Sequence, residues 1–279
     1  MATENTPPEN GFIPVSPLHR IEIAEGLRHL IDSPQEKDFP LATIATKRGP
    51  DGRELVSSHL VIAGRRTREA FPLARKYPVH FLKTYSPWTF HGDPKIEYDL
   101  TLKASEILGS PPPIGCDRNS FRSSFLPGKP LSRLSPFTDV QPDSRCLGIA
   151  EEAPPATLIG LWHLAEQVYD QINRLHQHGF FHRDLELHNI IVCTAPVRAF
   201  LIDFESAIQD FDGSEEERED LRFRDLAELY RLAVFIQSGL GRQETPLGTE
   251  AEAAIPRLFK DPATFAARLD DADRRAAGG

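Results

Sequence analysis

The stretch from His182 to Val192 holds the residues of this chain best suited to chemistry. It contains a carboxylate, Asp184, and an amide, Asn189, five positions later, and it leads into an apolar segment typical of a strand. A second carboxylate, Asp203, follows the apolar residues 199–202. A base for a hydroxyl group, together with two oxygen ligands of the kind that Mg²⁺ prefers, predicts phosphoryl transfer, which needs positioning and charge neutralisation more than covalent chemistry.

The order of these residues indicates how they are held. Asp184 is predicted to accept or orient the proton of the attacking hydroxyl, while Asn189 and Asp203 offer oxygen atoms to the metal. Residues 190–193 and 199–202 are predicted to form two short strands joined by a turn at Pro196. The short loop before them must turn so that the base and the metal ligands face one cleft.

These residues resemble the protein-kinase-like superfamily. The catalytic pattern His-Arg-Asp-Leu-x-x-x-Asn is matched in full by His182, Arg183, Asp184, Leu185 and Asn189. The metal-binding pattern Asp-Phe-Gly is matched at Asp203 and Phe204, but Glu205 stands where the family has glycine. The sequence around these motifs is similar to that of small atypical kinases of bacterial type. These are either the Kdo/heptose lipopolysaccharide kinases or minimal Ser/Thr protein kinases.

The resemblance implies a role for each matched residue and two cofactors, ATP and Mg²⁺. Asp184 would be the catalytic base, and Asn189 and Asp203 the magnesium ligands. His182 would brace the backbone of the loop. Arg183 corresponds to the arginine that meets an activation-loop phosphate in regulated protein kinases.

A kinase also needs a lysine for the nucleotide phosphates and a carboxylate to hold that lysine. The aromatic and branched content of residues 79–85 predicts a strand that carries Lys83. After it, Asp93 and a proline are typical of a helix start, and an apolar stripe predicts a helix up to Gly109. Glu97 on this helix is the expected partner of Lys83, with Glu106 as the alternative.

Other contacts to the nucleotide are less well marked. The stretch 64–69, with Gly64 and Arg65, is the first candidate for the phosphate-binding loop, although it has one glycine. A second stretch, residues 48–53, is richer in turn residues and is interpreted as an ordinary hairpin turn. Adenine is expected near residues 122–126, which include Phe125.

The predicted fold class is α+β, with a two-lobed kinase-like fold: a small N-lobe of antiparallel sheet with one helix, and a mainly helical C-lobe. The predicted boundaries are an N-terminal extension with one helix at 1–40, the N-lobe at 41–126, the C-lobe at 127–270 and a flexible tail at 271–279.

Within the extension, residues 2–16 are expected to form a loose arm and residues 21–31 a helix. In the C-lobe, helices are expected from about Leu158 to Gln177 and from Asp225 to Gly239, and the acidic run 214–220 is expected to be a solvated loop.

Composition sets broad limits. The chain has 279 residues and a formal net charge of -9, which offers no basic surface for nucleic acid. Its three cysteines, Cys116, Cys146 and Cys193, are scattered, which favours a reducing, cytoplasmic compartment. No run approaches the roughly twenty apolar residues of a membrane span.

The function predicted from these observations is ATP- and Mg²⁺-dependent transfer of the γ-phosphoryl group to a hydroxyl acceptor. Only 21 residues lie between Asp203 and Asp225, so a peptide-docking platform is expected to be short or absent. Protein Ser/Thr is slightly favoured over a sugar or small-molecule hydroxyl. The alternative is a pseudokinase scaffold that binds nucleotide or protein, because Glu205 and the glycine-poor loop depart from the family pattern.

Overall fold

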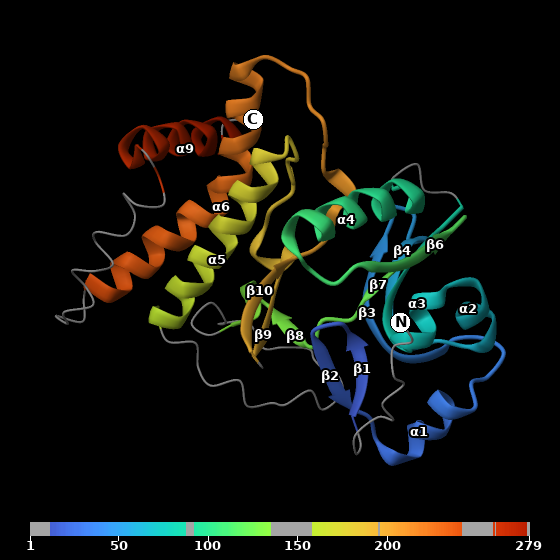
Figure 1. Cartoon of the computed structure of the whole chain (residues 1–279). Coiled ribbons are helices and arrows are strands. Elements are labelled where there is room, and N and C mark those ends of the chain that lie inside the picture. The colour runs from blue at the N-terminus through green and yellow to red at the C-terminus, as the bar shows by residue number, and fades with distance from the viewer. Residues whose placement is uncertain are drawn as a thin grey trace, which may run out of the picture. The chain divides into compact units, whose positions relative to one another are not determined.

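The computed structural model describes residues 12–87, 92–134, 158–194, 196–241, 259 and 261–277 (Figure 1). The described residues form two compact units, of which the first ends at Gly128 and the second begins at Lys129. Antiparallel sheet dominates the first unit and helices dominate the second. The α+β, kinase-like two-lobed fold class predicted from the sequence is therefore confirmed.

A five-stranded antiparallel sheet in the order β3-β4-β5-β7-β6 is the frame of the first unit. Its strands are β3 (Phe39–Arg48), β4 (Glu54–Ile62), β5 (Val79–Tyr85), β6 (Pro113–Asp117) and β7 (Ser120–Ser124). Two short helices, α2 (Arg65–Ala70) and α3 (Pro72–Lys76), connect β4 to β5. The central strand β5 has the bounds that the sequence predicts for the lysine-bearing strand.

Helix α4 (Pro94–Leu108) follows β5 and packs against β6 and β7. The Asp93 carboxylate accepts a hydrogen bond of 2.8 Å from the backbone N–H of Lys95, which caps the helix start. The helix ends at Gly109, whose φ of 65° lies in the left-handed region that glycine adopts without strain. Both boundaries are local signals, and the helix predicted from them is confirmed.

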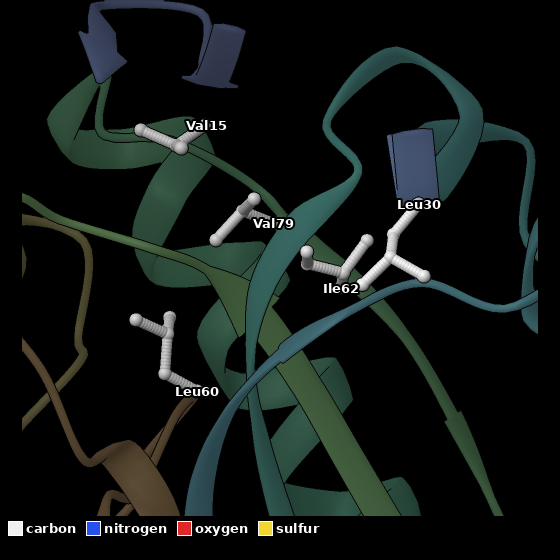
Figure 2. Close-up of a cluster of buried hydrophobic side chains, with 5 residues drawn as sticks. All are labelled: Val15, Leu30, Leu60, Ile62 and Val79. Carbon is white, nitrogen blue, oxygen red and sulfur yellow. The ribbon is translucent and has the colours of Figure 1, made fainter. Parts of the chain in front are cut away.

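An N-terminal hairpin and helix pack on the sheet of the first unit. They are β1 (Phe12–Ser16), β2 (His19–Glu22) and α1 (Glu25–Asp32). Five buried aliphatic side chains from the hairpin, α1, β4 and β5 form the cluster shown in Figure 2, namely Val15, Leu30, Leu60, Ile62 and Val79. Burying such a side chain contributes roughly 1.5–3 kcal/mol, so this cluster fixes the N-terminal elements to the sheet.

The predicted structure of the N-terminal extension needs correction. Residues 2–11 of the expected loose arm lie outside the described residues, but residues 12–16 form β1 rather than a loose arm. Ile21, which was expected to begin a helix, lies in β2 and pairs with Ile13 across the hairpin. In β1, Ile13 and Val15 are both buried, which is the two-residue period of a strand, and the helix begins only at Glu25.

A buried polar cluster joins the segment before β3 to strands β5 and β7. Arg122 Nη1 lies 2.7 Å from Asp38 Oδ2 and 3.1 Å from His80 Nε2. Because a guanidinium only donates, His80 accepts through Nε2. Burial, and then the charge of Arg122, lower the pKa of His80 to about 4. The folded protein therefore stabilises the neutral imidazole.

This cluster predicts that the first unit loses stability in mild acid. The folded-state pKa of His80 lies below the ordinary value of 6.5, so the unfolded chain binds the extra proton and stability falls as pH drops from about 6.5 towards 4. Between pH 7.5 and pH 5, His80 should account for about 2 kcal/mol of lost unfolding free energy, as measured by urea denaturation. The loss should shrink in His80→Gln and persist in His163→Gln, whose imidazole is exposed. An undiminished loss in His80→Gln would contradict this account.

Among its described residues, the second unit combines a small sheet with three α-helices. The sheet has the order β10-β9-β8 and is formed by β8 (Gly128–Pro130), β9 (Ile190–Thr194) and β10 (Val197–Leu201). The helices with described bounds are α5 (Leu158–Gln177), α6 (Glu215–Gly241) and α9 (Pro262–Ala277). The apolar stripe predicted for α5 is buried at Leu161, Leu164, Val168, Ile172 and Leu175.

Helix α5 is also joined to the sheet by hydrogen bonds. The side-chain oxygen of Gln167 accepts from the Ala199 N–H at 3.0 Å, and Gln171 Nε2 donates to the Ala199 carbonyl at 3.0 Å. Two glutamines one helical turn apart thus satisfy both backbone groups of one residue on β10. The strand that leads to Asp203 is fixed by this contact.

Two predictions for the second unit are wrong. Helix α6 begins at Glu215, ten positions before Asp225, so most of the expected acidic loop is its first turn and a half. The cause is a capping box, in which the Ser214 N–H donates to Glu217 Oε2 at 2.7 Å and the Glu217 N–H donates to Ser214 Oγ at 3.2 Å. Helix α9 continues to Ala277, so most of the expected flexible tail is helical.

Candidate active site

The segment between α5 and β9 positions the predicted catalytic residues. Helix α5 is followed by Gly179, whose φ is 67°, and the chain then reverses direction through buried Phe180 and Phe181. Phe181 and Ile208 exchange two backbone hydrogen bonds of 2.9 Å. These contacts deliver the chain to His182 in a fixed orientation.

The carboxylate of Asp225, on α6, organises the loop that follows. Its Oδ2 atom accepts the N–H of His182 at 2.8 Å, and its Oδ1 atom accepts the N–H of Arg183 at 2.6 Å. His176 Nε2, from the last turn of α5, lies 2.9 Å from the same Oδ2. Asp225 is 1% exposed, so these donors replace water around a buried charge.

Two residues of the site have left-handed backbone conformations. Arg183 has φ of 67° and Asp203 has φ of 63°, which cost roughly 1–2 kcal/mol each for side chains other than glycine. Such strain persists where surrounding contacts determine the backbone, as the hydrogen bond to Asp225 does for Arg183. The side chain of Arg183 is exposed.

His182 braces the loop from inside the unit. Its Nε2 atom lies 3.0 Å from the Ile202 carbonyl oxygen, and its ring centroid lies 4.9 Å from that of Phe204. Because a carbonyl only accepts, Nε2 carries the proton. Burial lowers the pKa of His182, so the ring is neutral near pH 7. This places His182 as a link between the two segments that carry Asp184 and Asp203.

Asn189 is oriented as a metal ligand would need to be. It is 3% exposed, and its Nδ2 donates to the Asp184 carbonyl oxygen at 2.9 Å. With the nitrogen used in this way, the amide oxygen is the atom left to meet a cation. The Asn189 carbonyl also accepts a hydrogen bond from the Ile202 N–H at 3.0 Å. Ile202 directly precedes Asp203, so this bond holds the backbone next to Asp203 beside Asn189. The donor set of one amide and one carboxylate oxygen fits Mg²⁺.

Glu205, in place of the family's glycine, does not obstruct this geometry. The left-handed residue is Asp203, whereas Glu205 lies in a 3₁₀ turn from Phe204 to Ser206 with its side chain exposed. Among the described residues, Glu205 is not one of those with positive φ. The backbone freedom of glycine is therefore not needed at this position.

The segment after the turn is short and well anchored. Phe204 is 2% exposed and meets Phe180 edge to face, with ring centroids 5.9 Å apart. Arg218, on α6, donates to the Phe211 carbonyl at 2.8 Å and to the Gly213 carbonyl at 3.3 Å. With the Ile208 bridge described above, contacts recur along the whole of residues 204–214.

In the first unit, Lys83 is paired with the expected carboxylate. Lys83 Nζ lies 3.2 Å from Glu97 Oε1, and the two residues are 8% and 2% exposed. The alternative partner, Glu106, is exposed and lies 3.9 Å from Lys103 instead. Tyr85 also donates a hydrogen bond from its hydroxyl to Glu97 Oε2.

Gly64 and Arg65 do not form the predicted phosphate-binding loop. They begin helix α2, and their backbone N–H groups donate to Asp38 Oδ1 at 2.8 Å and to the Gln35 carbonyl at 2.7 Å. A Cβ atom at Gly64 would lie 2.3 Å from the carbonyl carbon of Lys37. Gly64 is therefore needed for close packing, and its N–H is not directed at a ligand.

The second candidate stretch forms the hairpin turn between β3 and β4, as interpreted from the sequence. The N–H of Gly49 donates to the Arg53 carbonyl, that of Gly52 to the Gly49 carbonyl, and that of Arg53 to Asp51 Oδ1. Pro50 has no N–H. Since these donors stabilise the turn itself, the turn is not a preformed cradle for phosphate.

Phe125 packs against the cluster of Figure 2, and its contact with adenine stays a prediction.

Comparison with known proteins places the catalytic region in a family context. Residues 162–246, which include most of α5, the catalytic loop, β9, β10 and α6, match the model of the lipopolysaccharide kinase (Kdo/WaaP) family. No curated protein matches the chain. The match covers the segment in which Asp225 holds the His182–Asn189 loop.

The chain is a kinase of the small, atypical, protein-kinase-like kind.

Two further observations bear on the sequence predictions for this kinase. Among the described residues, no helix has the length and apolar character needed to cross a membrane. Cys116 and Cys193 are free thiols, and Cys146 lies outside the described residues.

Sequence reasoning missed two residues of the site. His176 belongs to the helix predicted up to Gln177, and its position in the last helical turn, six residues before His182, is the one local signal for its contact with Asp225. The aromatic side chain of Tyr85 indicates a strand, and its place two positions after Lys83 puts both side chains on the same face of that strand.

The kinase should depend on Asp225 for the stability of its catalytic loop. In Asp225→Asn, the amide can accept through one atom only, so at least one buried donor of the loop or of His176 loses its partner. The unfolding free energy should fall by about 2–3 kcal/mol, measured by urea denaturation. Asp212→Asn, an exposed control in the same region, should change it by less than about 0.5 kcal/mol. Equal losses in both variants would show that the carboxylate does not hold the loop.

Proposed function

We propose that this kinase transfers the γ-phosphoryl group of ATP, with Mg²⁺, to a hydroxyl group of a sugar-containing acceptor. The observation that carries the proposal is the loop from His182 to Asn189, whose backbone and amide contacts fit a base and a metal ligand within the segment that matches the lipopolysaccharide kinases. Asp184 would orient the acceptor hydroxyl and take up its proton.

The other site residues support the reacting groups. Lys83, held by Glu97, would bind phosphate oxygens of ATP. Asn189 and Asp203 would hold Mg²⁺, which neutralises charge that develops on the phosphates. His182 would keep the two segments in register. With no glycine-rich cradle among the described residues, Lys83 and the metal would carry most of the interaction with the phosphates.

The sequence alone slightly favours protein Ser/Thr as the acceptor, whereas we propose a sugar hydroxyl. The matched family is named for lipopolysaccharide, and the match covers the catalytic loop and the segment after it. That segment, residues 204–214, is short and carries no long platform on which a peptide could dock. A compact segment suits a small hydroxylated acceptor better than an extended peptide.

The proposal is tested first by the chemistry of phosphate transfer. Purified protein with radiolabelled ATP and Mg²⁺ should transfer label to a sugar acceptor. Asp184→Ala should lower kcat at least about 100-fold, because general-base catalysis contributes about 10²–10⁴-fold. Asp203→Ala should also lower kcat strongly, because it removes a ligand of the metal that neutralises charge on the phosphates. Chelation with EDTA should abolish transfer, and added Mg²⁺ should restore it. Glu216→Ala, an exposed residue of α6, is the control that should keep wild-type turnover. Equal label in the wild type and the Asp184 and Asp203 variants would point to a pseudokinase scaffold.

The class of acceptor needs its own measurement. Initial rates should be compared for a panel of free sugars and sugar-containing lipids and for a panel of unstructured Ser/Thr-rich proteins, each with the Asp184→Ala variant as background. We expect kcat/KM to be at least about ten-fold higher for the best sugar acceptor, which corresponds to about 1.4 kcal/mol of preferential transition-state binding. Faster, Asp184-dependent labelling of protein would reverse the assignment of the acceptor and leave the kinase assignment standing.

A further inference from the structure

Glu97, the carboxylate that holds Lys83, is bound at both of its oxygen atoms by residues of β5. Oε1 lies 3.2 Å from Lys83 Nζ, and Oε2 accepts a hydrogen bond from the Tyr85 hydroxyl. Lys83 and Tyr85 are two positions apart on one strand, so both side chains project from the same face towards α4. Helix α4 is thus attached to β5 at one residue by two different contacts.

Tyr85 also contacts the lysine itself. Lys83 Nζ lies 5.4 Å from the centroid of the Tyr85 ring, within the range in which an ammonium group is attracted to an aromatic face. A single side chain therefore meets both members of the ion pair, with its hydroxyl on the anion and its ring near the cation. Lysine and glutamate side chains lose much rotational freedom when paired, whereas tyrosine has two side-chain torsions to fix.

The position of Tyr85 is itself closely determined. The residue is 4% exposed, and its backbone N–H donates to the Asn119 carbonyl at 2.8 Å. Gly92, just before α4, lies so close that a Cβ atom there would be 2.4 Å from Tyr85 Cε1, and its φ of 90° is also one that glycine tolerates. The ring therefore has little room to swing away from Glu97.

We propose that Tyr85 is a positioning residue that keeps the Lys83–Glu97 ion pair formed, whether or not ATP is bound, by fastening α4 to β5. The inference rests on the proposed function, because it assigns Tyr85 a part in presenting Lys83 to ATP. Separation of α4 from the sheet must break a buried hydrogen bond to a charged group in addition to the ion pair. This contact of Tyr85 with Glu97, here called the clamp, thereby opposes a movement of α4 that would separate Lys83 from Glu97.

Tyr85→Phe is the sharpest test, because it removes one oxygen atom and keeps the ring over Lys83. Loss of a hydrogen bond to a charged group should lower the ratio of closed to open pair about ten-fold. Hydrogen exchange of the amides in the first two turns of α4 should therefore speed up about ten-fold, and KM for ATP should rise several-fold with a smaller change in kcat. Tyr98→Phe, one position after Glu97 on the same helix, is the matched control and should change neither quantity.

A double-mutant cycle separates positioning from a general structural role. If Tyr85 acts through Glu97, the effect of Tyr85→Phe on α4 exchange should drop below about two-fold in a Glu97→Gln background, because the charged acceptor is already lost. An undiminished effect in that background, or unchanged exchange in the Tyr85→Phe single variant, would overturn the clamp.

The exchange measurement does not depend on catalysis, so the two proposals fail separately. The clamp alone would be refuted if the wild-type protein transfers phosphate and the Tyr85→Phe variant has the same α4 hydrogen-exchange rates and the same KM for ATP as the wild type. Protein that transfers no phosphate, but in which Tyr85→Phe speeds α4 exchange in the Glu97-dependent manner, would refute the proposed function and leave the clamp as a structural fact.

Discussion

The site in the second unit depends on one buried carboxylate. Asp225 accepts hydrogen bonds from two consecutive backbone N–H groups, at His182 and Arg183, and from the side chain of His176. Burying a charge is unfavourable unless donors surround it, so the carboxylate and the loop stabilise one another. The same interaction holds Arg183 in a left-handed conformation that it would not otherwise prefer. The direction in which the chain enters the Asp184–Asn189 turn is set by this contact.

In the first unit, the buried charges that need polar partners are cations rather than a carboxylate. Lys83 is a buried cation on the central strand, and Glu97 and Tyr85 surround it with a carboxylate and an aromatic face. A second buried cation, Arg122, is satisfied by Asp38 and by neutral His80. Both clusters lie on the central strands β5 and β7, so the sheet is stabilised by polar contacts as well as by its apolar cluster.

Sequence signals predicted the parts of this structure that depend on neighbouring residues. Strand β5, helix α4 with its Asp93 cap and Gly109 stop, and the stripe of α5 all follow from local propensity and periodicity. The start of α6 was missed although its capping box, Ser214 with Glu217, is visible in the sequence, because the acidic run was read as solvated. The role of Gly64 could not be predicted from the sequence. Glycine is required there because the backbone of Lys37, which is far away along the chain, leaves no room for a Cβ atom. The Asp38–Arg122 contact is equally distant and leaves no pattern in the sequence.

The segment from Phe204 to Ser214 has a thermodynamic consequence. Fixing a residue from a disordered state costs roughly 1–2 kcal/mol of conformational entropy, and a long disordered loop would incur that cost each time a substrate ordered it. Here the Phe181–Ile208 bridge, the buried Phe204 ring and the Arg218 contacts have already ordered the backbone during folding. A molecule that bound against this segment would therefore not have to order its backbone, and the free energy of its contacts would not be reduced by that entropy loss.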